Sequence, residues 1–140
     1  MEQSEDTPAG TTATSGIVSR RSPAGVAETV NRLREAIETA GAKVFAVIDQ
    51  SAEARHAGLE LRDTRMVIFG NPSAGTQMMQ VAPLVALDLP LRLLVWADDA
   101  ATVWMTYLSP DWVTQRYGLT PGQARPLGAL EALTAKVAAG

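Results

Sequence analysis

Segment 69–79 contains the residues of this chain best suited to binding a ligand. Its sequence is Phe-Gly-Asn-Pro-Ser-Ala-Gly-Thr-Gln-Met-Met, which follows a β-branched run and precedes an apolar, helix-like segment. This order predicts a strand, a tight turn and a helix N-terminus, where backbone N–H groups favour carboxylate, phosphate or sulfate. We therefore expect an anion at the amides of residues 73–77. The candidate ligand-binding residues of this segment, called the signature turn, are Gly70, Asn71, Pro72, Gly75 and Thr76.

The same residues also have a purely structural interpretation. Asn71 and Thr76 can cap backbone donors, while Gly70 and Gly75 permit dihedral angles that other residues avoid. Neither Lys nor Arg occurs within the turn, and the GxxxxGK[ST] pattern of a P-loop is absent. The sequence therefore leaves open whether the signature turn binds a ligand or only joins a strand to a helix.

Two further side chains lie at the ends of predicted strands, which are frequent positions for catalytic groups. Asp49 follows one predicted strand, and Tyr107 ends another. An aspartate and a tyrosine can perform acid–base chemistry if burial shifts their pKa values. An enzyme that uses Asp49, Thr76 and Tyr107 around the signature turn is therefore one hypothesis. A structural role for Asp49, as the cap of a short helix over residues 51–57, is the alternative.

Composition excludes several classes of site. The chain has no cysteine and a single histidine, His56, so disulfides, thiolate nucleophiles, cysteine zinc sites and paired histidine ligands are excluded. We expect no bound metal and no cofactor. Twelve basic and fifteen acidic residues give a net charge of -3 without a basic stripe, which argues against a nucleic-acid partner.

The N-terminal residues 1–16 contain no Leu, Ile, Val, Phe or Trp and are predicted to be a disordered tail. They also lack the basic and apolar regions of a signal peptide. The most apolar later stretch, residues 81–97, is interrupted by proline and charge and does not read as a membrane span. We therefore expect a cytoplasmic protein without a membrane partner.

Hydrophobic patterning predicts one domain over residues 17–140. A helix closed by Gly41 and a last helix each carry an apolar stripe, and a hairpin places Trp96 opposite Trp104. The segment 76–87 is predicted as a helix that Thr76 caps. Together the elements indicate an α+β two-layer sandwich, with a mixed sheet of roughly five strands and helices packed mainly on one face. The predicted strands cover residues 16–21, 43–48, 64–69, 91–96 and 102–107.

Two methionines follow the Gly-Thr pair of the signature turn. Met78 and Met79 stand among other apolar residues, and methionine suits both irregular core gaps and adaptable contact surfaces. Besides core packing, they are candidates for the apolar wall of a ligand site or for a dimer contact.

Several blocks of sequence closely resemble the family known as domain of unknown function 302. The resemblance covers roughly residues 17–140 and implies a compact α+β domain, commonly a dimer, without implying an activity. Where relatives often have His after the strand-end Asp and Pro after the Gly-Thr pair, this chain has Gln50 and Gln77. The blocks are Ile68-Phe-Gly-Asn-Pro72, Gly75-Thr76-x-Met78-Met79-Gln80, Ala82-Pro83 and Leu87-Asp-Leu-Pro-Leu91.

The sequence therefore favours a homodimeric module that binds a small anionic or apolar ligand or interacts with a partner. The alternatives are the acid–base enzyme described above and a purely structural or partner-binding module. A pocket at the signature turn with Asp49 or Tyr107 turned into it would favour the enzyme. A flat apolar surface at Met78 and Met79 would favour the interaction module.

Overall fold

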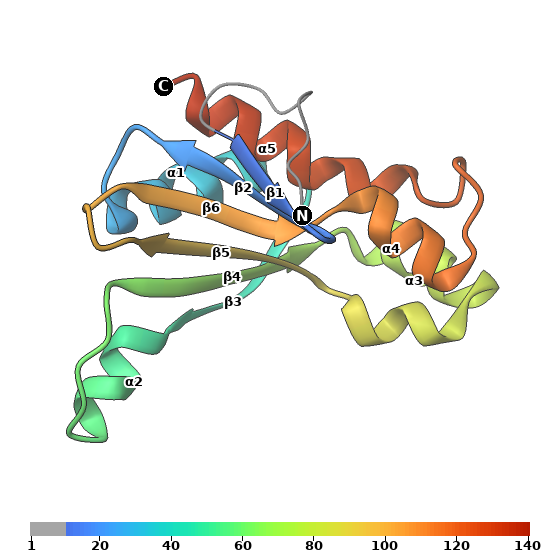
Figure 1. Ribbon diagram of the computed structural model, residues 1–140. Coiled ribbons are helices and arrows are strands. Elements are labelled where there is room, and N and C mark those ends of the chain that lie inside the picture. The colour runs from blue at the N-terminus through green and yellow to red at the C-terminus, as the bar shows by residue number, and fades with distance from the viewer. Residues whose placement is uncertain (1–10) are drawn as a thin grey trace.

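The computed structural model describes residues 11–140, which form one six-stranded sheet with helices around it (Figure 1). The strand order is β1-β2-β6-β5-β4-β3, and every neighbouring pair is antiparallel. The strands are β1 (Thr11–Thr14), β2 (Ile17–Ser22), β3 (Lys43–Asp49), β4 (Thr64–Gly70), β5 (Leu91–Ala97) and β6 (Val103–Leu108).

Two helices, α1 and α5, pack against each other on one side of the sheet (Figure 1). Helix α2 lies beyond one end of the sheet, and α3 and α4 lie beyond the opposite end. The helices are α1 (Val26–Thr39), α2 (Gln50–His56), α3 (Pro72–Val81), α4 (Pro110–Tyr117) and α5 (Ala129–Ala138). Two 3-10 helices are η1 (Pro83–Asp88) and η2 (Arg125–Gly128).

The core lies between this helix pair and the sheet. Strand side chains alternate between the two faces of a sheet, and every second residue is buried from Leu91 to Val95 of β5 and along β6, as are Val67 and Phe69 of β4. These residues meet the apolar stripes of the helices, as the spacing predicts. The core includes Val30, Leu33 and Ile37 of α1, Leu130, Leu133 and Val137 of α5, and Val67, Phe69, Leu93, Val95 and Met105 of the sheet.

The α+β sandwich is therefore confirmed, and all five predicted strands occur, while the predicted mixed sheet is wrong. Residues 11–140 form an antiparallel sheet, to which β1 adds a sixth strand. The reason is connectivity: β3, β4, β5 and β6 follow one another as sequential neighbours, and α1 carries the chain from β2 to the far edge at β3. The cross-strand pairing of Trp96 with Trp104 is confirmed.

The prediction of a disordered tail over residues 1–16 is wrong for Thr11–Thr14, which form the edge strand β1. Backbone pairing with β2 needs no large apolar side chain, and threonine suits strands because it is β-branched. Gly16 closes the turn with φ of +79°, and a Cβ there would lie 2.7 Å from the Trp112 ring. Residues 1–10 lie outside the described part of the chain.

One predicted helix start also moves. Helix α1 begins at Val26 after Gly25, and the Ser22 hydroxyl before it bonds Thr29 Oγ1 (2.6 Å) and accepts from the Ala24 amide (3.2 Å). The segment 76–87 divides into α3 and η1. Within residues 11–140, no helix is both long and apolar enough to cross a bilayer.

Candidate functional site

The signature turn folds as a capped helix start in which the cap is Asn71. Its Oδ1 accepts hydrogen bonds from the amides of Ser73 (3.0 Å) and Ala74 (3.1 Å), and its carbonyl accepts from the Gly75 amide (2.8 Å). Pro72 occupies the first helical position, where its fixed φ suits the helix and no N–H is needed. The prediction that Thr76 caps the helix is therefore wrong.

This capping also overturns the expected anion site at the amides of residues 73–77. The first of these donors are satisfied by Asn71, so they are not available to a carboxylate or phosphate. The sequence was ambiguous here because Asn-Pro and Gly-Thr are both helix-start signals, four residues apart. The Asn-Pro pair comes first along the chain and is used.

A cleft of about 630 Å³ opens beside this helix start, in the range usual for small-molecule sites. Its walls come from α3, the ends of β4 and β5, the start of β3, and the segment from η2 to α5. All five candidate residues of the signature turn line it, together with both methionines. The lining includes Phe45, Phe69, Gly70, Asn71, Pro72, Gly75, Thr76, Met78, Met79, Leu89, Pro90, Leu91, Arg125, Pro126 and Leu133.

The cleft is apolar at its base and polar at its rim. Phe69, Met78 and Leu91 are buried, and Met79 is partly buried. Asn71, Thr76 and Arg125 are exposed, and they are the polar side chains of the lining. The two methionines therefore form an apolar wall of the cleft.

The far wall of the cleft depends on η1, which Asp88 attaches to the rest of the fold. The Tyr117 hydroxyl of α4 donates a hydrogen bond to Asp88, and Arg92 and Arg116 lie 3.6 and 4.0 Å from its carboxylate. This hydrogen bond raises the pKa of Tyr117, because it stabilises the protonated phenol. Asp88 was not singled out from the sequence, since its partners come from β5 and α4.

Asp49 lies at the opposite end of the sheet. In the antiparallel register Asp49 stands opposite Arg65, whereas Gly70 of the signature turn stands opposite Lys43. Gly70 lies five positions along strand β4 from Arg65, a distance of roughly 17 Å at the usual rise per residue. Asp49 therefore does not take part in the cleft.

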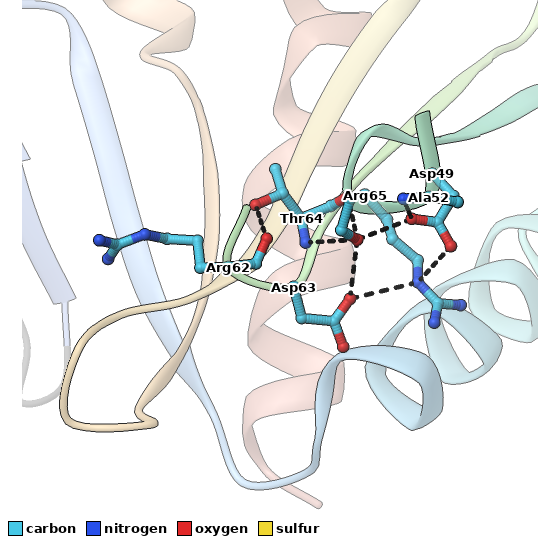
Figure 2. A network of polar contacts seen from close by, with 7 residues as sticks. Asp49, Ala52, Arg62, Asp63, Thr64 and Arg65 are labelled. Carbon is cyan, nitrogen blue, oxygen red and sulfur yellow. Dashed lines mark hydrogen bonds and ion pairs between the residues drawn. The ribbon is translucent and has the colours of Figure 1, made fainter. Parts of the chain in front are cut away.

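The Asp49 carboxylate belongs to a network that joins α2 to β4 (Figure 2). It caps α2 by accepting from the Ala52 amide (2.9 Å), and it accepts a hydrogen bond from the Ser51 hydroxyl (2.7 Å). These two bonds lower the pKa of Asp49 below its ordinary value. Arg65 Nε lies 3.5 Å from Asp49 and 3.6 Å from Asp63. The cap role of Asp49 is thus the one that the structure supports.

Ser51 holds this network together. It is buried, and its hydroxyl accepts a hydrogen bond from the Thr64 amide (3.3 Å) while donating to Asp49. The only sequence signal was a small polar residue close to a strand-end acid. Arg65 Nε is buried and forms ion pairs but no hydrogen bond within residues 11–140. The hydrogen bonds of Ser51 and Asp49 connect α2 to β4, which is a structural role.

Tyr107 is also separate from the cleft, since it does not belong to the lining and is 3% exposed in the core. Its hydroxyl is buried without a hydrogen-bond partner among residues 11–140, and burial raises its pKa. Asp49, Thr76 and Tyr107 do not form one site. The structure therefore contradicts the particular enzyme hypothesis that combined them.

The comparisons with known proteins agree with this fold. Residues 18–137 match the protein family described as "Domain of unknown function DUF302". The chain belongs to this family. The crystal structure of an uncharacterized conserved DUF302 protein from Bacillus stearothermophilus has a TM-score of 0.74, with 18% identity over 90% of this chain and 98% of that one. At that identity the likeness supports the fold alone.

Curated relatives of this DUF302 domain include longer proteins. "Fluoride-specific ion channel FluC 1" of Brucella suis is 43% identical over 105 residues, which are 75% of this chain and 41% of that protein. The protein of the same name from Brucella abortus matches equally over 39% of its length. The chain thus spans about two-fifths of these relatives.

Proposed function

We propose that this DUF302 domain binds a small, largely apolar molecule in the cleft at the signature turn. The observation that carries the proposal is the lining of the cleft. The motif that characterises the sequence, from Gly70 to Met79, provides much of that lining, together with Leu89, Pro90 and Leu91 of the last family block.

Gly75 adds a local argument. A glycine inside a helix costs about 0.5–1 kcal/mol relative to alanine, and here φ is not positive, so the backbone does not require it. No atom lies within 4 Å of the position that its Cβ would take, and the residue faces the cleft. The glycine thus keeps space open, which benefits a ligand more than the fold.

The proposal is tested with N-phenyl-1-naphthylamine, an uncharged dye that fluoresces on entering apolar sites. The wild-type chain should enhance its fluorescence in a saturable way. Gly75→Leu places a large side chain in the cleft and should weaken binding at least tenfold. The control Ala27→Leu adds the same side chain on the exposed face of α1 and should bind like wild type. Equal binding by both variants would show that the dye does not occupy the cleft.

The homodimer and the cytoplasmic location remain predictions. For the dimer, the supporting observation is a stripe of exposed aliphatic side chains along the end of α3 and η1. Residues three apart share a face of a 3-10 helix, and Val81, Leu84 and Leu87 are 56%, 71% and 68% exposed. Light scattering should return twice the chain mass for the wild type and the chain mass for Leu84→Glu. A monomeric wild type at micromolar concentration would contradict the predicted homodimer.

A second candidate function is an accessory role beside an ion channel. It is favoured by the Brucella relatives, in which a segment like this chain forms part of a protein named as a fluoride-specific channel. If the domain responds to that ion, sodium fluoride should raise its melting temperature in a saturable way. Sodium chloride at the same ionic strength is the control, and an equal response to both salts would count against this role.

A further inference from the structure

We infer that the ligand of the cleft is an anionic amphiphile, with an apolar body at the base of the cleft and an acidic head group at Arg125. This inference rests on the proposed function and names the chemical class of its ligand. It follows from three features of the lining, namely its charge, its free hydrogen-bond donors and its gradient of burial.

The lining has one kind of charge. Arg125 is its single charged residue, and within residues 11–140 its guanidinium forms no ion pair. A second cation stands close by, because Lys43 Nζ lies 5.2 Å from the ring centre of Phe45, which itself lines the cleft. No carboxylate lines the cleft to balance these cations. A cationic head group would therefore be repelled, and an anionic one attracted.

The free polar groups of the lining can all donate hydrogen bonds. Asn71 uses Oδ1 to cap α3, which leaves the two N–H groups of its amide without a partner in the described chain. The Thr76 hydroxyl and the Arg125 guanidinium likewise have no hydrogen bond to residues 11–140. A head group that only accepts hydrogen bonds, such as a carboxylate, matches this set.

The neighbour of Arg125 shows where the arginine lies relative to α3. Pro126 lines the cleft together with Ala74 and Met78, and the same three residues line a second hollow of about 260 Å³ beside α3. Arg125 therefore lies on the side of the cleft that Ala74 and Met78 of α3 form.

The gradient of burial orients the ligand. The three donors are exposed at the rim, whereas the buried lining residues at the base are apolar. A charged group at the rim keeps most of its hydration, so its desolvation costs little. An alkyl or aryl body at the base is removed from water, which stabilises the complex.

The test compares three probes with the same ten-carbon chain, each below its micelle concentration: decanoate, 1-decanol and decyltrimethylammonium. Calorimetric titration of the wild-type chain should show decanoate binding about tenfold more tightly than decanol, as expected for hydrogen bonds to a charged group. The cation should bind most weakly. Arg125→Gln should remove the advantage of decanoate over decanol, and Arg125→Lys should retain part of it.

The matched control is Arg34→Gln, which removes an exposed arginine from α1 and should leave the decanoate preference unchanged. Because Arg125 is exposed and unpaired within the described chain, its substitution should not alter the melting temperature of the free protein. Decanol binding as tightly as decanoate, with both weakened by Gly75→Leu, would overturn the inference and leave the cleft intact. A decanoate preference that survives Arg125→Gln would also overturn it. If none of the three probes and no dye binds, the proposed function fails as well.

Discussion

At the α2 end of the sheet, the Asp49 carboxylate accepts hydrogen bonds from Ser51 and Ala52 and lies near Arg65 (Figure 2). At the opposite end, the cleft carries three exposed side chains whose donors have no partner in the described chain, above a buried apolar base. The first region has more of the residue types that catalysis uses. The second has a cleft and solvent-exposed donors that a ligand could reach, so residue type alone points to the end that has no cleft.

The largest loss of stability should come from the base of the cleft, where a core side chain also lines the cleft. Phe69 is 1% exposed, so Phe69→Ala should lower the free energy of unfolding by about 3–5 kcal/mol in urea titrations. Phe45 also lines the cleft but is 44% exposed, and Phe45→Ala should cost well under half as much. Equal losses would mean that the rim and base of the cleft are not distinct.

A smaller loss of stability is expected from a substitution at the α2 end of the sheet. Ser51→Ala leaves the buried Thr64 amide without its acceptor, so the free energy of unfolding should fall by about 1–3 kcal/mol. Ser73→Ala is the control, because Ser73 is exposed and its hydrogen bond to Asn71 comes from the backbone amide, which the substitution keeps. Equal losses of stability for the two variants in thermal unfolding would show that the Ser51 network does not stabilise the contact between α2 and β4.

Removing the cap of α3 should lower stability moderately. The comparison of Asn71 with Thr76 shows which of the two helix-start signals is used. Asn71→Ala should cost about 0.5–2 kcal/mol, the usual loss for an N-cap. Thr76→Ala should change stability by a few tenths of a kcal/mol at most, since Thr76 lies inside the helix and alanine favours helices. Differential scanning calorimetry measures both, and a larger loss for Thr76→Ala would restore it as the cap.

The smallest effect should be a pH dependence at the α2 end. Hydrogen bonds from Ser51 and Ala52 lower the pKa of Asp49 in the folded state. Asp49 therefore adds stability above the ordinary aspartate pKa of about 3.9, and this is lost as pH falls through the lower folded value. Between pH 5 and acid unfolding, the melting temperature of Asp49→Asn should fall less steeply than that of wild type. Glu35→Gln, which removes an exposed acid from α1, should keep the wild-type slope.

Much of the fold was predictable from local patterns. The apolar stripes of α1 and α5 and the Trp96–Trp104 hairpin follow from spacing alone, because side chains of one face recur with the period of the element. Strand β1 escaped prediction, since it joins the sheet by backbone pairing with β2, which needs no hydrophobic pattern in the sequence.

For the cleft, the sequence identified one wall and missed the other. The signature turn was visible because its glycines, asparagine and proline are contiguous. Arg125 follows Thr76 by some fifty residues and stands in no motif, so only the packing of α5 and η2 brings it to the cleft. Asp49 and Tyr107 were grouped with the turn because strand ends resemble one another in sequence. Asp49 ends β3, which is antiparallel to β4, so it lies at the opposite end of the sheet from the turn. Strand β6 runs in the same direction as β4, but the Tyr107 side chain is buried in the core and does not line the cleft.

The centre of the sheet has one further consequence. Strands β5 and β6 pair from Leu94 to Ala97 and from Val103 to Thr106, whereas Leu91 to Leu93 of β5 pair with β4 alone. The sheet therefore divides at the end where Leu91 lines the cleft. A second hollow of about 250 Å³ lies at this division and is lined by Leu94, Tyr107 and Leu108. Leu91 lines both hollows, so the start of β5 is the partition between the cleft and the gap in the sheet.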